Sequence, residues 1–161
     1  MSETAEVNPK TALPDEFEYV DLGAVVGTTL NETRHEYKES APSRAQRLAS
    51  AGDVFYQTVR PYQKNNYLFE NADSTPFVFS TGYAQLRPQG DSYFLLTLLQ
   101  VENFVSRVMD RSTGTSYPAI NSSDLGNMHV DVPEDAEQTK IGSLFKSLDK
   151  LIAANQQELI T

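Results

Sequence analysis

Side chains that could catalyse a reaction are sparse in this sequence. Its two histidines, His35 and His129, form no HxH or HxxxH pair, so a metal site would have to recruit carboxylates around them. Residues 112–116 (STGTS) lack the GxxxxGK spacing of a phosphate-binding loop, and Asp53 follows a glycine, which is more typical of a turn than of an acid–base catalyst. Cysteine is absent, so thiolate chemistry and disulfides are excluded. These observations predict no catalytic residues and no metal site, and they disfavour an enzyme acting on nucleic acid.

Side chains that bind nucleic acid are instead concentrated in residues 52–66 (GDVFYQTVRPYQKNN). Arginine and lysine hydrogen-bond guanine, asparagine and glutamine hydrogen-bond adenine, and tyrosine contacts phosphate or sugar. The alternative is a β-hairpin whose polar side chains simply alternate toward solvent, and composition alone slightly favours it. The candidates in this stretch are Tyr56, Gln57, Arg60, Tyr62, Lys64, Asn65 and Asn66.

The charge is distributed unevenly along the chain. The net charge of −9 argues, taken alone, against a nucleic-acid partner. Residues 1–40 contain nine acidic and three basic residues, whereas residues 41–69 contain Arg44, Arg47, Arg60 and Lys64 against the single acid Asp53. The acidic remainder either is solvated, which is the favoured interpretation, or faces a basic partner protein.

The elements that must position these side chains are mostly short strands. We expect strands at residues 17–26, 53–59, 77–81 and 83–87, and a partner strand within 65–71 after a turn at 64–66. Residues 28–52 show no sustained alternation and are predicted to form a long surface loop with at most one helical turn.

Helical periodicity appears later in the chain. A buried helix is expected over residues 91–109 with Asp91 as its N-cap, then a loop and a short edge strand at 129–133. Arg107 and Arg111 either complement the negative dipole at the C-terminal end of this helix or contact a ligand. Tyr117 either fills the core or contacts a ligand. An amphipathic helix over 134–161 carries a narrow apolar seam that needs a partner: Ile141, Leu144, Phe145, Leu148, Leu151, Ile152 and Leu159.

Length and composition set the class of protein. A chain of 161 residues with 39% hydrophobic residues is long enough for one ordinary globular domain. Residues 1–15 are polar without a period and are expected to be a disordered lead-in or linker. No segment approaches the roughly 20 apolar residues of a membrane span, so a cytoplasmic protein with no membrane association is expected.

Three stretches in order resemble the DNA-specificity subunit of type I restriction–modification enzymes: RAQRLASAGDVFYQTVRPYQKNNY, PFVFSTGYAQLRP and GTSYPAINSSDLGNMHVDVPEDAEQTKIGSLFKSLDKLIAANQQEL. The resemblance covers residue 16 to the end. It implies an α+β fold in which a twisted, β-rich target-recognition domain with a buried helix (16–133) is followed by a long conserved helix (134–161).

The resemblance also implies function and partners. Such a subunit is non-catalytic, reads double-stranded DNA and docks methyltransferase (modification) subunits, which bind S-adenosylmethionine; this chain itself would hold no cofactor. A nuclease–translocase (restriction) subunit joins the full complex. Matching the motifs places Arg60 of VRP at the DNA-facing surface and makes it the best single contact. The resemblance also implies that the loops STGY and GTSYPAI flank the DNA, which adds Tyr83, Thr115 and Tyr117 to the candidates, together with Thr113 beside the second loop, Arg44, Arg47 and Arg111.

The sequence departs from the family pattern in carrying one recognition domain and one helix, where a complete subunit has two of each. Either it is a half-subunit that pairs with itself through the apolar seam and reads an interrupted palindrome, or it is a piece of a longer subunit. We expect weak DNA affinity in isolation. A different function, an assembly module with a dimerising helix and no DNA contact, remains as the alternative.

Overall fold

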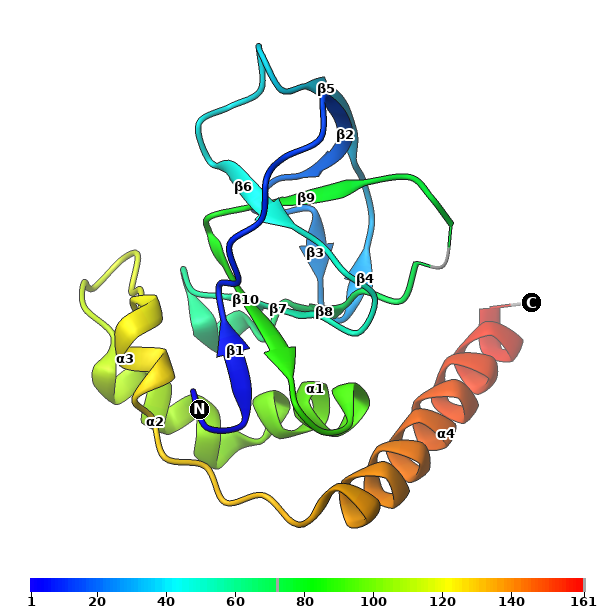
Figure 1. The fold of residues 1–161 in the computed structure, drawn as a ribbon. Helices are drawn as coiled ribbons and strands as arrows, with labels where there is room; N and C mark the ends of the chain where they lie inside the picture. Colours follow the sequence, from blue (N-terminus) through cyan, green and yellow to red (C-terminus); the bar gives the residue numbers. More distant parts are fainter. Residues whose placement is uncertain (72, 161) are drawn as a thin grey trace.

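The computed structural model describes residues 1–71 and 73–160 and arranges them as two stacked sheets, a layer of helices and a protruding C-terminal helix (Figure 1). The antiparallel β7 sheet has the strand order β1-β10-β7-β8, and the mixed β9 sheet has the order β5-β2-β9-β6 with β2 parallel to β9. A separate hairpin pairs β3 with β4. The fold is therefore α+β, as predicted.

The strand bounds are as follows: β1 Ala5–Val7, β2 Glu16–Val20, β3 Val25–Val26, β4 Thr29–Leu30, β5 Arg34–Tyr37, β6 Ala45–Leu48, β7 Val54–Gln57, β8 Asn66–Leu68, β9 Phe77–Ser80 and β10 Tyr83–Pro88. The helices are the 3₁₀ turn η1 (Pro61–Gln63), α1 (Ser92–Gln100), α2 (Glu102–Arg111), α3 (Ser122–Gly126) and α4 (Asp135–Ile160).

Strand β7 is buried on both faces because it lies in the middle layer. Val54 and Tyr56 point into the cluster formed with α1 and α2, and Tyr56 meets Phe104 edge to face. Phe55 points the other way, into the cluster between the sheets, where its ring stacks on Phe79 with centroids 3.6 Å apart. Successive side chains of a strand point to opposite faces, so a strand covered on both sides buries all of them.

Several expected strands are confirmed, and others are corrected. The structure confirms strands within 53–59, 65–71, 77–81 and 83–87. The strand expected at 17–26 is two strands, because Asp21 and Gly23 (φ +95°) form a turn between β2 and β3. The loop expected at 28–52 contains β4, β5 and β6, which have two to four residues each and are too short to show alternation.

Two further expectations for irregular and edge segments were wrong. Residues 1–15 are not simply a disordered lead-in, because β1 pairs with β10 and Ala5 is buried in the core. Residues 129–133 form no strand; the guanidinium of Arg107 donates to the backbone oxygen of His129 instead.

The helix expected over 91–109 is two helices, α1 and α2, separated at Val101. The side chain of Asp91 accepts from the backbone N–H of Phe94 at 2.8 Å, which confirms the predicted N-cap. Val101 has extended dihedral angles (φ −67°, ψ 131°) and caps the end of α1 and the start of α2. The apolar period continues across this residue, so the pattern could not reveal the break.

Helix α4 begins beside α1, and its C-terminal end extends away from the globule (Figure 1). Its first turns pack on α1, where the buried Gln138 accepts from the backbone N–H of Asp91 at 3.2 Å and donates to the oxygen of Pro133 at 2.9 Å. Farther along, Tyr93 bonds Asp149, and Lys146 lies 3.3 Å from Glu70. The predicted C-terminal helix is thus confirmed, although residue 161 lies outside the described residues.

Candidate nucleic-acid interface

Arg60 is held in a sharply folded segment directly after β7. Its backbone N–H donates to Pro118 at 2.7 Å, and it has left-handed dihedral angles (φ 52°, ψ 56°) immediately before the 3₁₀ turn that begins at Pro61. Lys64, at the other end of the turn, is also left-handed (φ 56°). Residues other than glycine adopt this conformation at a cost of order 1–3 kcal/mol, and such residues cluster at functional sites.

The guanidinium of Arg60 stacks on the ring of Tyr117. The carbon atom at the centre of the guanidinium lies 4.2 Å from the ring centroid, and Tyr117 is 67% exposed. The loop that carries Tyr117 is closed by a pair of backbone hydrogen bonds between Thr113 and Ala119 (2.9 and 3.0 Å). Gly114 (φ +96°) is required in this loop, since a β-carbon there would lie 3.0 Å from the carbonyl oxygen of Tyr117. The result is a flat, cationic pair in which Tyr117 is exposed and Arg60 is partly buried.

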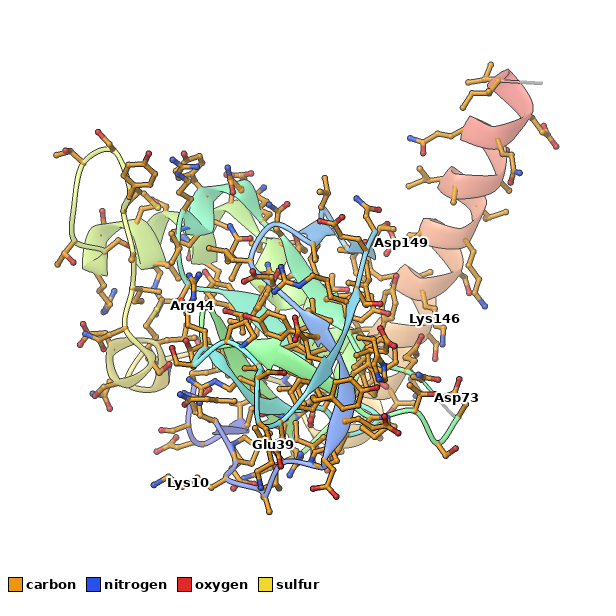
Figure 2. The ribbon with its side chains drawn as sticks, turned by 90° about the horizontal axis from the view of Figure 1, so that it is seen from above. Lys10, Glu39, Arg44, Asp73, Lys146 and Asp149 are labelled. Atoms are coloured by element: carbon orange, nitrogen blue, oxygen red, sulfur yellow. The ribbon has the colours of Figure 1, made fainter. Side chains whose placement is uncertain are left out.

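Arg44 and Arg47 are connected to the segment that leads to Arg60 through the turn between β9 and β10. The backbone N–H of Thr81 donates to the backbone oxygen of Arg44 at 2.9 Å, and the side chain of Arg47 donates to the backbone oxygen of Tyr83 at 3.3 Å. The oxygen of Gly82 in the same turn accepts from the backbone and hydroxyl of Thr58 (both 3.0 Å), two residues before Arg60. Burial lowers the pKa of the Arg47 guanidinium. Arg44 lies on the side of the globule away from α4 (Figure 2).

Four of the predicted DNA contacts have buried side chains: Tyr56, Gln57, Asn66 and Tyr83. Gln57 donates to the oxygen of Val59 at 2.7 Å, and the oxygen of Asn66 accepts from the backbone of Gln57 at 3.1 Å. Tyr83 bonds the oxygen of Asp21, and burial raises its pKa to about 12; burial also raises the pKa of Tyr56. These side chains therefore support the loops from behind, since β7 and β10 occupy the middle layer.

The remaining predicted contacts differ in how free they are. Tyr62, Thr113 and Thr115 are exposed. Lys64 forms an ion pair with Glu102, and the side-chain oxygen of Asn65 accepts from the backbone N–H of Gly27 at 2.8 Å. Arg111 is exposed at the end of α2 and donates to the oxygen of Arg107 at 3.2 Å, which suits an interaction with the helix dipole.

An ion pair missed by the sequence reasoning lies at the start of β7, at the opposite end of this strand from Arg60, between the buried Asp53 and the partly buried Arg87. Asp53 is buried and accepts from Arg87 twice (2.9 and 3.1 Å), from Gln85 at 2.7 Å and from the backbone of Ser50 at 2.8 Å. The hydrogen bond to Asp53 raises the pKa of Arg87. The only acid in residues 41–69 is thereby neutralised internally, and the arginines at the surface keep their excess of positive charge.

Across residues 1–71 and 73–160, no cluster of three or more histidine, cysteine, aspartate or glutamate side chains could hold a metal ion. His35 lies 3.2 Å from Glu18 and 3.3 Å from Glu16, and His129 lies 2.8 Å from Asp131; of these side chains, Glu18 is partly buried and the others are exposed. Among the described helices, none is long and apolar enough to cross a membrane.

The apolar seam of α4 lies largely in the open. Leu151 is 61% exposed. Ile141 is partly buried, and the other predicted seam positions are exposed as well: Leu144, Phe145, Leu148, Ile152 and Leu159. An exposed apolar stripe of this length marks an interaction surface.

Comparison with known proteins connects this surface to a family. The family model of the type I restriction modification DNA specificity domain matches residues 30–161. The chain is 23% identical over 145 residues to the type I restriction enzyme HindI specificity subunit of Haemophilus influenzae, covering 86% of this chain and 31% of that protein.

Solved structures agree. The HsdS subunit from Thermoanaerobacter tengcongensis superposes with a TM-score of 0.75 at 28% identity, over 97% of this chain and 42% of that one. A chain from a structural study of complex assembly and conformational transition of the type I R-M system gives the same TM-score at 26% identity, over 93% of this chain and 39% of that one. The chain thus spans less than half the length of these relatives. It belongs to the family of type I restriction–modification DNA specificity domains and is a target-recognition domain of the specificity-subunit type, which is itself non-catalytic.

Proposed function

We propose that this chain reads one half of a bipartite DNA site and that the Arg60–Tyr117 pair faces the duplex. The observation that carries the proposal is the stack of Arg60 on an exposed tyrosine, held by a strained turn and a closed loop. Within the described residues, no salt bridge engages Arg60, so its charge is available to a phosphate or a guanine edge. Arg44, Arg47, Tyr62, Thr113 and Thr115 extend this surface, with Lys64, Asn65 and Arg111 at its margin.

Helix α4 supplies the assembly surface in this proposal. The helix docks methyltransferase subunits, which bind S-adenosylmethionine, and a nuclease–translocase subunit joins the full complex in the cytoplasm. The recognition domain would comprise residues 16–133 together with β1, and residues 134–161 would form the spacer helix. Pairing of two copies through the seam would place two recognition domains about a two-fold axis, which favours an interrupted palindromic site.

Substitution of Arg60 tests the role in DNA reading. The matched control is Arg34, which also lies over a tyrosine, Tyr19, at 5.2 Å, but belongs to β5 and pairs with acids. The chain would be assembled with its methyltransferase subunits, and binding to the methylated cognate sequence would be compared with binding to a scrambled one. We expect Arg60→Ala to reduce the cognate-to-scrambled ratio about tenfold or more, as loss of a base contact does, while Arg34→Ala leaves the ratio unchanged.

The outcomes separate the possible roles. Equal weakening on both sequences would make Arg60 a phosphate contact and not a base contact. Unchanged binding in Arg60→Ala and in Arg44→Ala would refute this surface and support the alternative, an assembly module that does not contact DNA.

A further inference from the structure

The β3–β4 hairpin carries an exposed apolar side chain beside Arg60. Val26 is 57% exposed, whereas its neighbour Val25 is fully buried in the cluster between the sheets. Val26, Arg60 and Tyr117 line the same surface hollow, which has a volume of about 430 Å³. The sequence reasoning did not single out any residue of this hairpin.

The position of the hairpin is fixed relative to Arg60. The backbone N–H of Gly27 donates to the side chain of Asn65 at 2.8 Å, and the backbone N–H of Asn66 donates to the oxygen of Gly27 at 3.1 Å. Asn65 and Asn66 follow Lys64, the C-cap of η1, and Arg60 is the N-cap at the other end of this turn. With Val25 anchored in the core, the hairpin tip is held at three points, so the exposure of Val26 is a property of a rigid element.

The hollow has one apolar wall and one polar wall. Leu22, Val26 and Val59 form the apolar part, while Arg60, Gln63 and Asn65 supply hydrogen-bonding groups. None of the described lining residues is acidic. A cationic hollow with an apolar side suits a nucleotide, because the phosphate is anionic and the base can carry a methyl group. Among the four unmodified bases, only thymine presents a methyl group in the major groove, its C5-methyl.

We propose that the β3–β4 hairpin is a second DNA-reading element, in which Val26 contacts the C5-methyl group of a thymine next to the base that Arg60 contacts. The inference deepens the proposed function and rests on it. It adds a specificity residue that lies outside residues 41–69, where the basic charge is concentrated.

A double-mutant cycle, which changes Val26 in the protein and removes the methyl group from the DNA, tests this directly. The complex of this chain with its methyltransferase subunits would be titrated with the methylated cognate duplex and with duplexes in which each thymine in turn is replaced by deoxyuridine, which lacks only the methyl group. For the wild type, one replacement should weaken binding about three- to fivefold, the effect of one buried methyl contact. In Val26→Ala the same replacement should have no further effect, and Val26→Thr, which keeps the branched shape, should restore part of the loss.

Each other outcome overturns the inference in a distinguishable way. Equal losses on deoxyuridine for wild type and Val26→Ala would show that Val26 does not meet the methyl group. Weakened assembly with the methyltransferase subunits at unchanged discrimination would place the hairpin against protein. Binding of all sequences alike by the wild-type complex would overturn the proposed function itself, and this inference with it.

Discussion

Gly142→Ala should destabilise the protein, although glycine-to-alanine changes inside helices usually stabilise. Gly142 lies in α4 where the helix crosses the start of α1. A β-carbon there would lie 2.1 Å from the carboxylate oxygen of Asp91 that caps α1, and 3.1 Å from the backbone nitrogen of Phe94. That oxygen already accepts from Phe94 at 2.8 Å, so it cannot move away without breaking the cap.

The magnitude follows from three opposed effects. Helix propensity favours alanine over glycine by about 1 kcal/mol. Loss of an N-cap costs about 1 kcal/mol, and inserting a methyl group into a packed contact costs about 1–3 kcal/mol. The free energy of unfolding should therefore fall by about 1–3 kcal/mol in Gly142→Ala.

Urea unfolding followed by circular dichroism measures this change. Ser143→Ala, on an exposed position of the same helix, is the control, and its stability should rise slightly. In an Asp91→Ala background, which has already lost the cap and the obstructing carboxylate, adding Gly142→Ala should be neutral or stabilising. Stability of Gly142→Ala at or above that of the wild type would refute the argument that the contact between α4 and Asp91 requires glycine at this position.

Three further changes follow from the structure. Asp53→Asn should lower the free energy of unfolding by about 2 kcal/mol, because it leaves the partly exposed Arg87 without its buried partner, and a change under about 0.5 kcal/mol in urea unfolding would contradict this. Hydrogen bonding to Glu18 raises the pKa of His35 above 6.5. Protonated His35 therefore stabilises the folded state fully below pH 6.5, and this stabilisation is lost as the pH rises through the raised pKa. An NMR titration of His35 should show the raised pKa, and Glu18→Gln should remove most of the shift. Leu148→Asp, on the exposed seam, should lower the solution mass measured by light scattering if two copies pair through α4, and an unchanged mass across a concentration series would argue against that pairing.

Local sequence patterns predicted the elements with strong periods and failed at the short ones. The long helix at the C-terminus and the N-cap at Asp91 were correct because a 3.6-residue period and a capping aspartate are local signals. Strand β5 was missed because it has four residues, three of them exposed, and it is held only by pairing with β2. The break at Val101 was invisible because both helices bury the same apolar period on one core.

Which of the candidate site residues are exposed could not be predicted from the sequence alone. Side-chain type identified Tyr56 and Asn66 as contacts, but layer order decides exposure, and a strand in the middle layer buries its polar side chains as well as its apolar ones. The pairing of Arg60 with Tyr117 joins positions 57 residues apart in the sequence and depends on the backbone bonds that bring the two loops together. A signal was available in the glycine of GTSYP, which predicts a tight loop, but not in which residue the loop would meet.

The charge of this chain constrains how it can read DNA. Asp53 is neutralised by Arg87 and the charge of Lys64 is paired with Glu102, so Arg44, Arg47 and Arg60 remain as the basic groups of the proposed surface, apart from Arg111 at its margin. Three cations neutralise few phosphates, and the net charge of −9 repels the duplex at long range. Specificity in such a surface must come from shaped, hydrogen-bonding and apolar contacts such as Arg60 on Tyr117 and the wall at Val26. In the proposed function, affinity then comes from a second recognition domain or from methyltransferase subunits docked on α4, because each added surface turns the next contact into an intramolecular one.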